Sequence, residues 1–510
     1  MSAQRGRNHQ EFTTSGLLIG NLIYAANGCS LTGPNSFPTA FPATQVSPAG
    51  CAAYNPFGQQ NSAAVLDYIT DEQFQDIFVY QDVVSANLSG RLFDLPGGPL
   101  SIATGVEHRR DELQTVAREQ NRVGYFLAGN FTTFGGVSKV TEGYIEVGAP
   151  LLKDIAGAQT LELNGAIRRT HYSLSGNVTT WKLGAVYEPI DALRLRITRS
   201  HDIRAPNLNE LFFVGGGRQG NITNNIPGTT GFGVTAQTSN GGFGNPLLVP
   251  ETAETLTFGG VVQPAWGWSR GLKVSLDYYR IRIRDVIAQL AEQQTVDACG
   301  RGDQVACAGI TLDPARPNGL GFVKAIQFNL GTRRLSGLDF ELNYQVPLAD
   351  PDSRVGLRLL VNRAIEDRTT TLTSDLDSVG FASGVPKWRG NVMLTYGWRA
   401  FTTMVQVRAF SNIRYSNTLF GPDDPSYATR LASVATASTT INRNLFPGAA
   451  YVNAGFQYQA SPRVQVFVNV DNLLDKRPPQ YALFAFTNSS SASLYDLAGQ
   501  NYRGGVRFTF

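Results

Sequence analysis

The chain has 510 residues, of which 16% are charged and 42% apolar, and its formal net charge is +3. Soluble proteins average about 25% charged residues, so this composition argues against an ordinary soluble protein, and the small net charge gives no basis for nucleic-acid binding. No apolar run reaches about 18 residues, which excludes a transmembrane helix. Few charges without long apolar runs are typical of a membrane β-barrel, in which lipid-facing and lumen-facing side chains alternate.

The first part of the chain is irregular. Five prolines interrupt it: Pro34, Pro38, Pro42, Pro48 and Pro56. Either Asn61 or Ser62 can cap a short helix over residues 63–69. We predict that residues 1–75 form an extracellular-loop-like segment with this helix and a disulfide, and that residues 76–510 form the membrane barrel. Gly20 and Asn21 interrupt the apolar stretch 17–24, so no signal peptide is recognisable.

The four cysteines form two local pairs, Cys29 with Cys51 and Cys299 with Cys307. Both pairs lie in segments rich in turn-forming residues, and no histidine stands near either pair as a zinc ligand would. We therefore predict two loop disulfides in an oxidising compartment rather than a metal site, with free thiols as the alternative.

From about residue 80 to the end, apolar residues alternate with polar ones. Leu193, Leu195 and Ile197, for example, alternate with Arg194 and Arg196. Many such stretches exceed about ten residues, the length that crosses a bilayer at a tilt. The last stretch, residues 501–510, ends in an aromatic residue without a tail, as the closing strand of an outer-membrane barrel does.

Short and long connections alternate along this region. The tight turns lie near residues 96–99, 153–157, 189–192, 264–271, 347–353, 397–400 and 460–462. The long connections lie near residues 114–137, 203–250, 286–320, 365–384, 414–448 and 474–500. Short periplasmic turns opposite long extracellular loops are the pattern of an outer-membrane barrel.

Two stretches depart from simple strands. Residues 331–337 look like a turn, but the apolar phase continues across them from Phe328 to Leu338, so we predict one long strand over 322–346 that projects beyond the membrane. Between Tyr278 and Ile281 the apolar phase shifts, which predicts either a β-bulge near 278–280 or the point where the strand leaves the lipid.

The predicted fold is an all-β, transmembrane antiparallel barrel portion with about fifteen strands. With an odd number, the first and last strands run in the same direction, whereas single-chain bacterial barrels close with an even number. We therefore expect an odd number of strands to be missing from the front of the chain.

Four motifs are similar to motifs of the TonB-dependent receptor family of the bacterial outer membrane, and they occur in the family's order. They are SHDIRAPNLNELF at 200–212, NPLLVPETAE at 245–254, NLGTRRLSGLDFE at 329–341 and NVDNLLDK at 469–476. A further match, GVEHRR at 105–110, lies upstream. The chain therefore resembles the barrel of this family.

The resemblance implies an outer-membrane barrel of about 22 strands that is filled by an N-terminal plug domain and energised by the TonB complex. It implies that a monomeric receptor, surrounded by outer-membrane lipid, takes up a scarce, bulky nutrient such as a ferric siderophore, cobalamin or an oligosaccharide. The plug, the TonB box and about seven strands have no counterpart in this sequence, so none of their roles can be assigned to its residues. A passive porin-like channel, a non-functional truncated receptor and an adhesin barrel are the alternatives.

Candidate ligand contacts follow from position alone. On the lumen parity they are Arg194, Arg196 and Asp277, and in the long loops they are the aromatic residues Phe212, Phe213 and Phe243. For the lumen residues, facing water or docking a plug is the structural alternative. The four histidines are scattered, with no metal spacing and no nucleophile beside them, so neither catalysis nor a resident cofactor is predicted.

Two polar groups receive structural interpretations. Arg204 and Glu210 are predicted to form an ion pair where a strand enters a loop. Asp471, Asn472 and Asp475 are predicted to cap a loop rather than to bind calcium.

Overall fold

The computed structural model describes the chain except residues 31–48, 58–60, 119–125, 127–129, 216, 372–374, 383, 417–418, 424–426, 428–440, 442, 480–493 and 510. Its main sheet has 20 strands, of which β8, β9, β12 and β15 belong to the extracellular connections and the other sixteen form one antiparallel ladder. These sixteen are β1 (Ser2–Leu17), β2 (Thr70–Leu95), β3 (Gly98–Ala117), β4 (Phe134–Ile155), β5 (Ala158–Tyr172), β6 (Gly176–Ile190), β7 (Leu193–Arg204), β10 (Glu251–Val262), β11 (Leu272–Gln289), β13 (Leu320–Pro347), β14 (Ser353–Thr370), β16 (Trp388–Trp398), β17 (Phe401–Phe410), β20 (Ala449–Ser461), β21 (Val464–Asp471) and β22 (Asn501–Phe508).

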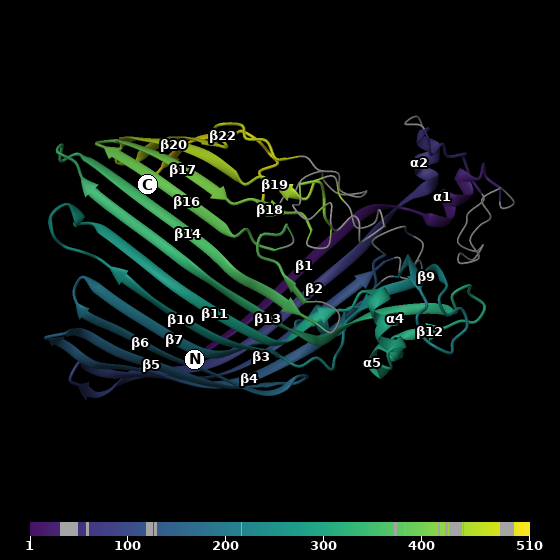
Figure 1. Ribbon diagram of the computed structural model, residues 1–510, viewed down its shortest axis with the longest axis horizontal. Helices are drawn as coiled ribbons and strands as arrows, with labels where there is room; N and C mark the ends of the chain where they lie inside the picture. The colour runs from purple at the N-terminus through teal and green to yellow at the C-terminus, as the bar shows by residue number, and fades with distance from the viewer. Residues whose placement is uncertain are drawn as a thin grey trace.

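Consecutive strands of the ladder pair with one another from β1 to β22, so the sheet has the up-and-down order of an outer-membrane barrel. Figure 1 shows the short turns gathered at one end of the barrel and the helices at the other. All seven predicted tight turns join consecutive strands. Among the described helices, none has the length and apolar character that a membrane crossing requires.

The two faces of the strands differ as the alternation predicts. On β11, Leu276 is 51% exposed on the outer face, whereas the next residue, Asp277, lines an internal cavity. Exposed Leu195, Ile197 and Phe258 share the outer face. This apolar belt faces lipid, and the opposite face lines the lumen.

The prediction of a loop-like segment over residues 1–75 is wrong at both ends. β1 pairs with β2 from Ser2 opposite Ser85 to Leu17 opposite Thr70, and β2 begins at Thr70. β1 is not recognisable in the sequence because the strand is polar on both faces. Most of it pairs with the part of β2 beyond the exposed apolar residues Val84 and Leu88, where both faces meet water.

Between β1 and β2 the chain forms α1 (Ile19–Ala26) and α2 (Ala63–Ile69), so the predicted helix has its predicted bounds. The two helices share a core of Ala25, Val65, Tyr68 and Ile69, and the Cys29–Cys51 disulfide closes a loop within this connection. Ser62 is the N-cap residue of α2. Four of the five prolines, from Pro34 to Pro48, lie outside the described residues, as does the terminal aromatic residue Phe510.

The described ladder therefore has sixteen strands rather than fifteen. With sixteen, β1 and β22 run in opposite directions, so the inference that an odd number of strands is missing does not hold. No ladder joins β1 to β22 within the described residues.

The predicted long strand is confirmed, because β13 runs without interruption from Leu320 to Pro347. The predicted β-bulge at 278–280 is wrong. The β10–β11 register has no shift over Val274–Arg284, and the irregularity lies at Asp285, whose φ is 56°. The apolar outer face instead ends at Tyr278, which agrees with the other interpretation, that the strand leaves the lipid there.

The extracellular end of β13 supports a small subdomain. It consists of β8 (Arg218–Thr223), β9 (Thr235–Phe243), α4 (Glu292–Gly300), α5 (Gln304–Ala308) and β12 (Ile310–Leu312), with β9 parallel to β13. Its buried core includes Ile222, Val296, Leu320 and Val323. The Cys299–Cys307 disulfide ties α4 to α5.

Candidate functional site

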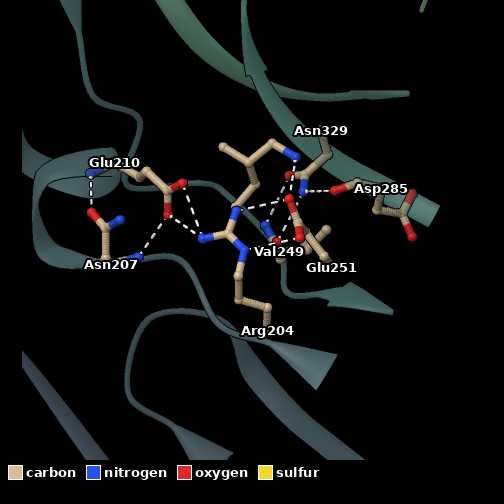
Figure 2. Close-up of polar contacts among 8 residues, drawn as sticks. Arg204, Asn207, Glu210, Val249, Glu251, Asp285 and Asn329 are labelled. Atoms are coloured by element: carbon tan, nitrogen blue, oxygen red, sulfur yellow. Dashed lines mark hydrogen bonds and ion pairs between the residues drawn. The ribbon is translucent and has the colours of Figure 1, made fainter. Parts of the chain in front are cut away.

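Three of the motifs meet in space where β7, β10 and β13 reach the extracellular side. Figure 2 shows Arg204 between two carboxylates, with Glu210 on one side and Glu251 on the other. Strand pairing explains part of this arrangement, because Glu251 is the register partner of Arg204. We call the residues labelled in Figure 2 the motif cluster.

Arg204 uses its whole guanidinium group. Its Nε and a terminal nitrogen donate to the two oxygens of Glu251, at 2.9 and 2.7 Å, and the other terminal nitrogen donates to Glu210 at 2.9 and 3.0 Å. Glu251 is buried and also accepts from the backbone N–H of Ile287 at 2.7 Å. A planar fork between two carboxylates fixes orientation as well as charge.

Glu210 also begins the helix that follows. In α3 (Leu208–Phe212), Asn207 Oδ1 accepts from the Glu210 backbone N–H, and Glu210 accepts from the Asn207 backbone N–H, both at 2.8 Å. This reciprocal capping explains the spacing of Asn207 and Glu210 in the motif. The predicted Arg204–Glu210 ion pair is confirmed.

Asn329 provides the third link. Its side chain bonds both backbone groups of Val249, at 3.0 and 2.9 Å, and donates to the carbonyl of Asp285 at 2.7 Å. It thus holds the positive-φ residue of β11 beside the end of the 203–250 connection. The motif cluster joins loop ends to strand ends, and its polar groups are directed at one another, as a structural role requires.

The inner wall of the barrel contains a cavity of about 1290 Å³. Its lining mixes apolar and polar side chains and bears charges of both signs: Arg196, Asp277, Asp339, Glu341, Arg389, Arg408, Asp471, Asp496 and Arg503. Residues 494–499 of the last long connection also contribute to the lining. A cavity of this size accommodates a ligand larger than most metabolites.

The structure brings two of the predicted lumen residues together in this wall. Arg196 forms a two-pronged pair with Asp277, at 2.7 and 2.6 Å, across β7, β10 and β11. Arg194 lies outside the cavity lining and pairs with Glu188 near the periplasmic turn. Any ligand that uses Arg196 or Asp277 must therefore compete with an existing pair.

The predicted loop aromatics lie apart from the cavity. Phe212 covers Gly136 so closely that a Cβ there would overlap its ring, and Phe213 meets Phe134 edge-on at 5.3 Å. Phe243 packs in the extracellular subdomain, where Lys324 Nζ lies 5.3 Å from its ring centre. Each ring has a packing role, and a ligand role for any of them stays a prediction.

Two residues of the cavity wall were not among the candidate ligand contacts predicted from the sequence. Arg389 on β16 and Arg408 on β17 are exposed to the cavity and form no salt bridge within the described part of the chain. The alternation of β16 predicts the inward position of Arg389, because Val392 and Leu394 are exposed on the opposite parity. Which inward arginines lack a carboxylate depends on neighbours distant in sequence, which the alternation does not reveal.

The predicted loop-capping group is also visible. Asn472 is buried at φ 49° and bonds the backbone of Lys476 in both directions, at 2.8 and 3.1 Å. Asp471 pairs with Arg503 at 2.7 Å. Within the described residues, no group of three or more His, Cys, Asp or Glu side chains is arranged to hold a metal ion.

The sequence matches the family model described as "TonB dependent receptor-like, beta-barrel" over residues 11–473. No curated protein matches it. A mutant of the ferric enterobactin receptor PfeA from Pseudomonas aeruginosa, in complex with enterobactin, is 15% identical with a TM-score of 0.58. The siderophore receptor PirA from Acinetobacter baumannii is 15% identical with a TM-score of 0.57. Both alignments cover 100% of this chain and 59% of the receptor.

A third solved structure is the hemophore receptor HasR of Serratia marcescens, 15% identical with a TM-score of 0.50 over 86% of this chain and 61% of that one. At these identities the likeness shows the fold alone, and the chain spans less than two thirds of the length of these receptors. Barrels of the matched family reside in the bacterial outer membrane, and the family consists of transporters rather than enzymes. The chain belongs to the TonB-dependent receptor family, and the matched residues correspond to the β-barrel of that family.

Proposed function

We propose that this barrel serves TonB-dependent uptake of a scarce, bulky and anionic ligand, such as a ferric siderophore, across the outer membrane. The cavity of about 1290 Å³ on the inner wall is the observation that carries the proposal. Its size suits a bulky ligand, and its charged lining suits a polar one. The siderophore receptors of similar fold support the choice of ligand class, and membership of the family supports coupling to TonB.

The anionic preference rests on Arg389 and Arg408. Asn391 is the register partner of Arg408, so the two arginines are diagonal neighbours on β16 and β17. Other charges of the wall are already bonded, as in Arg196–Asp277 and Asp471–Arg503. An unpaired guanidinium group binds a carboxylate, catecholate or phosphate oxygen strongly, because such hydrogen bonds are charge-assisted. A neutral oligosaccharide would gain little from these two residues.

Uptake measured in whole cells tests the coupling. Cells that depend on the full-length receptor receive radioactive ferric enterobactin, or radioactive cyanocobalamin as a ligand without comparable negative charge. We expect accumulation of the ferric siderophore and its loss in isogenic cells that lack TonB. Accumulation that continues without TonB would contradict energised uptake.

For a passive porin-like channel we expect the opposite result, uptake that does not need TonB. It would give steady conductance across planar bilayers and uptake that follows the concentration gradient in cells lacking TonB. Because the two measurements respond to different properties, a conducting barrel with TonB-dependent uptake would still favour the receptor, whereas conductance with TonB-independent uptake would favour the channel.

A further inference from the structure

Five arginines lie on the outer face of the barrel, beyond the extracellular edge of the apolar belt. They are Arg280, Arg282 and Arg284 on β11, Arg334 on β13 and Arg368 on β14, and we call them the outer arginine patch. All five are exposed. Strands β11, β13 and β14 lie side by side in Figure 1 and are consecutive in the ladder.

Strand parity places the patch on the lipid-facing side. The register of β11 has no shift from Leu272 to Arg284, so Arg280, Arg282 and Arg284 share the face of exposed Leu276. Asp277, on the other parity, lines the inner cavity. The isoleucines at 281 and 283, which suggested a bulge in the sequence, face inward and leave the arginines outside.

The register also sets like charges directly opposite one another. Arg282 is the partner of Arg334, and Arg334 is the partner of Arg368. Directly opposite side chains have Cβ atoms about 4.5–5.5 Å apart, and like charges in such positions are destabilising. Three arginines in line across three strands therefore favour a bound counter-charge.

The protein supplies only part of that counter-charge, through one salt bridge among the described residues. Arg280, Arg282, Arg284 and Arg334 form no salt bridge with any described residue, and Arg368 pairs only with exposed Asp375, at 3.2 Å. Three further carboxylates share the face. Glu254, opposite Arg282, is bonded to His201 Nδ1 at 2.8 Å, and Glu366 lies opposite Ser336. Asp377, opposite Arg368, accepts hydrogen bonds from the backbone N–H groups of Asp367 and Val379, at 3.3 and 3.1 Å.

The position of the patch along the strand indicates what compensates the charge. Tyr278 and Phe258 pack at 5.3 Å between ring centres, and aromatic residues of this kind mark the membrane–water interface. Arg280 lies two residues beyond Tyr278, or about 7 Å along the strand. The patch is thus at the height of lipid headgroups in the outer leaflet, directly beside the surface that contacts acyl chains.

We propose that the outer arginine patch binds the phosphate groups of lipid headgroups in the outer leaflet. Guanidinium groups take phosphate oxygens in a two-pronged geometry, and several arginines together can hold one phosphorylated headgroup. A lipid makes a second contact that free phosphate cannot make, because its acyl chains lie on the apolar belt at Leu276 and Phe258. This continuity of charge and apolar surface favours a lipid over a soluble anion.

Native mass spectrometry of the full protein in detergent tests the proposal. The probes are lipid A, dephosphorylated lipid A and inorganic phosphate. The test variant is Arg282→Gln/Arg334→Gln, and the control is Arg301→Gln/Arg316→Gln, which removes the same charge from the extracellular subdomain. We expect the unmodified protein and the control to bind lipid A about tenfold more tightly than its dephosphorylated form, and the test variant to lose this preference.

Three results would overturn the proposal: equal binding of both lipids by the unmodified protein, a test variant that keeps the preference, or displacement of lipid A by equimolar inorganic phosphate. The last result would assign the patch to a soluble anion. Heat-modifiable migration on a gel checks that each variant is folded. If the test variant does not fold, the comparison of the two lipids on the unmodified protein decides. Uptake plays no part in these measurements, so they are independent of the proposed transport function.

Discussion

Two adjacent residues of β13 show how differently the two faces of the barrel treat the same side chain. Arg333 faces inward and pairs with buried Asp367, at 2.8 and 3.0 Å. Arg334 faces outward and lies between Arg282 and Arg368. On the inner face the protein supplies carboxylates to Arg333 and Arg196, from Asp367 and Asp277. On the outer face Arg334 forms no salt bridge with any described residue, and its surroundings are water and lipid headgroups.

Removal of an inner carboxylate is expected to have the largest effect on stability. Glu251→Gln leaves Arg204 with only Glu210 and deprives the Ile287 N–H of a charged acceptor. Loss of a partner from a buried ion pair costs about 3–5 kcal/mol, and we expect about 2 kcal/mol because Arg204 is partly exposed. Urea unfolding of the detergent-solubilised protein measures this difference.

Asp352→Asn is the matched control, because Asp352 pairs with Arg399 at 3.4 Å and both side chains are largely exposed. Exposed pairs contribute about 0–1 kcal/mol, so this change is expected to leave the unfolding midpoint almost unchanged. Equal losses in the two variants would show that burial does not distinguish the inner pairs from surface pairs.

Two arginines of the inner face are an exception to this pairing. Arg389 and Arg408 line the cavity without a carboxylate partner in the described residues, so they resemble the outer arginines more than Arg333. Arg389→Gln/Arg408→Gln should leave stability nearly unchanged and weaken binding of an anionic ligand about tenfold, the equivalent of about 1.4 kcal/mol. Titration of the purified full-length receptor with ferric enterobactin measures the affinity. An unchanged affinity would remove these residues from the proposed site.

The sequence predicts most of the ladder and little of this charge arrangement. Alternation and turn spacing locate strands from β2 onward because each strand separates lipid from water, and the single strand β13 follows from an uninterrupted phase. The same reasoning misses β1, whose residues meet water on both faces and so carry no alternation. It also misplaces an irregularity at 278–280, because above the membrane the outer face becomes charged while Ile281 and Ile283 remain apolar on the inner face.

The candidate site is predictable only in part for a related reason. Parity places Arg196 and Asp277 on the inner face, but their pairing depends on the register of β7, β10 and β11. The motif spacing of Arg204 and Glu210 anticipates their ion pair, whereas the second carboxylate, Glu251, comes from another motif. Arg282, Arg334 and Arg368 are far apart in the sequence, and their alignment becomes visible only when three strands are paired.

A carboxylate placed on the outer face is expected to have the opposite effect to one placed on the inner face. Arg334→Glu would put a negative charge between Arg282 and Arg368, and opposite charges in such positions stabilise a sheet by about 0.2–1 kcal/mol. We expect a higher urea midpoint in detergent without phosphorylated lipid. The neighbouring change Arg333→Glu should lower the midpoint, because it sets a second carboxylate against Asp367. A fall in both variants would show that the outer arginines are not mutually repelling.

The smallest expected effect on stability comes from a carboxylate in a connection between strands, whose charge is stabilised by backbone amides. Asp423, in the connection between β17 and β20, accepts hydrogen bonds from the backbone N–H groups of Asn444 and Leu445. Burial alone would raise the pKa of Asp423, but these amides outweigh it and hold the pKa below its ordinary value of 3.8. Because the folded state lowers this pKa, the contribution to stability is present above pH 3.8 and is lost as the pH falls below it.

Hydrogen exchange at Asn444 and Leu445, corrected for the intrinsic rate at each pH, measures this loss. We expect protection of both amides to decrease as the pH falls below 3.8, and Asp423→Asn to show reduced protection with no further dependence over the same range. A pH dependence that persists in Asp423→Asn would have to come from another group. In that case the backbone amides of Asn444 and Leu445 would not be the groups that stabilise the charge of Asp423.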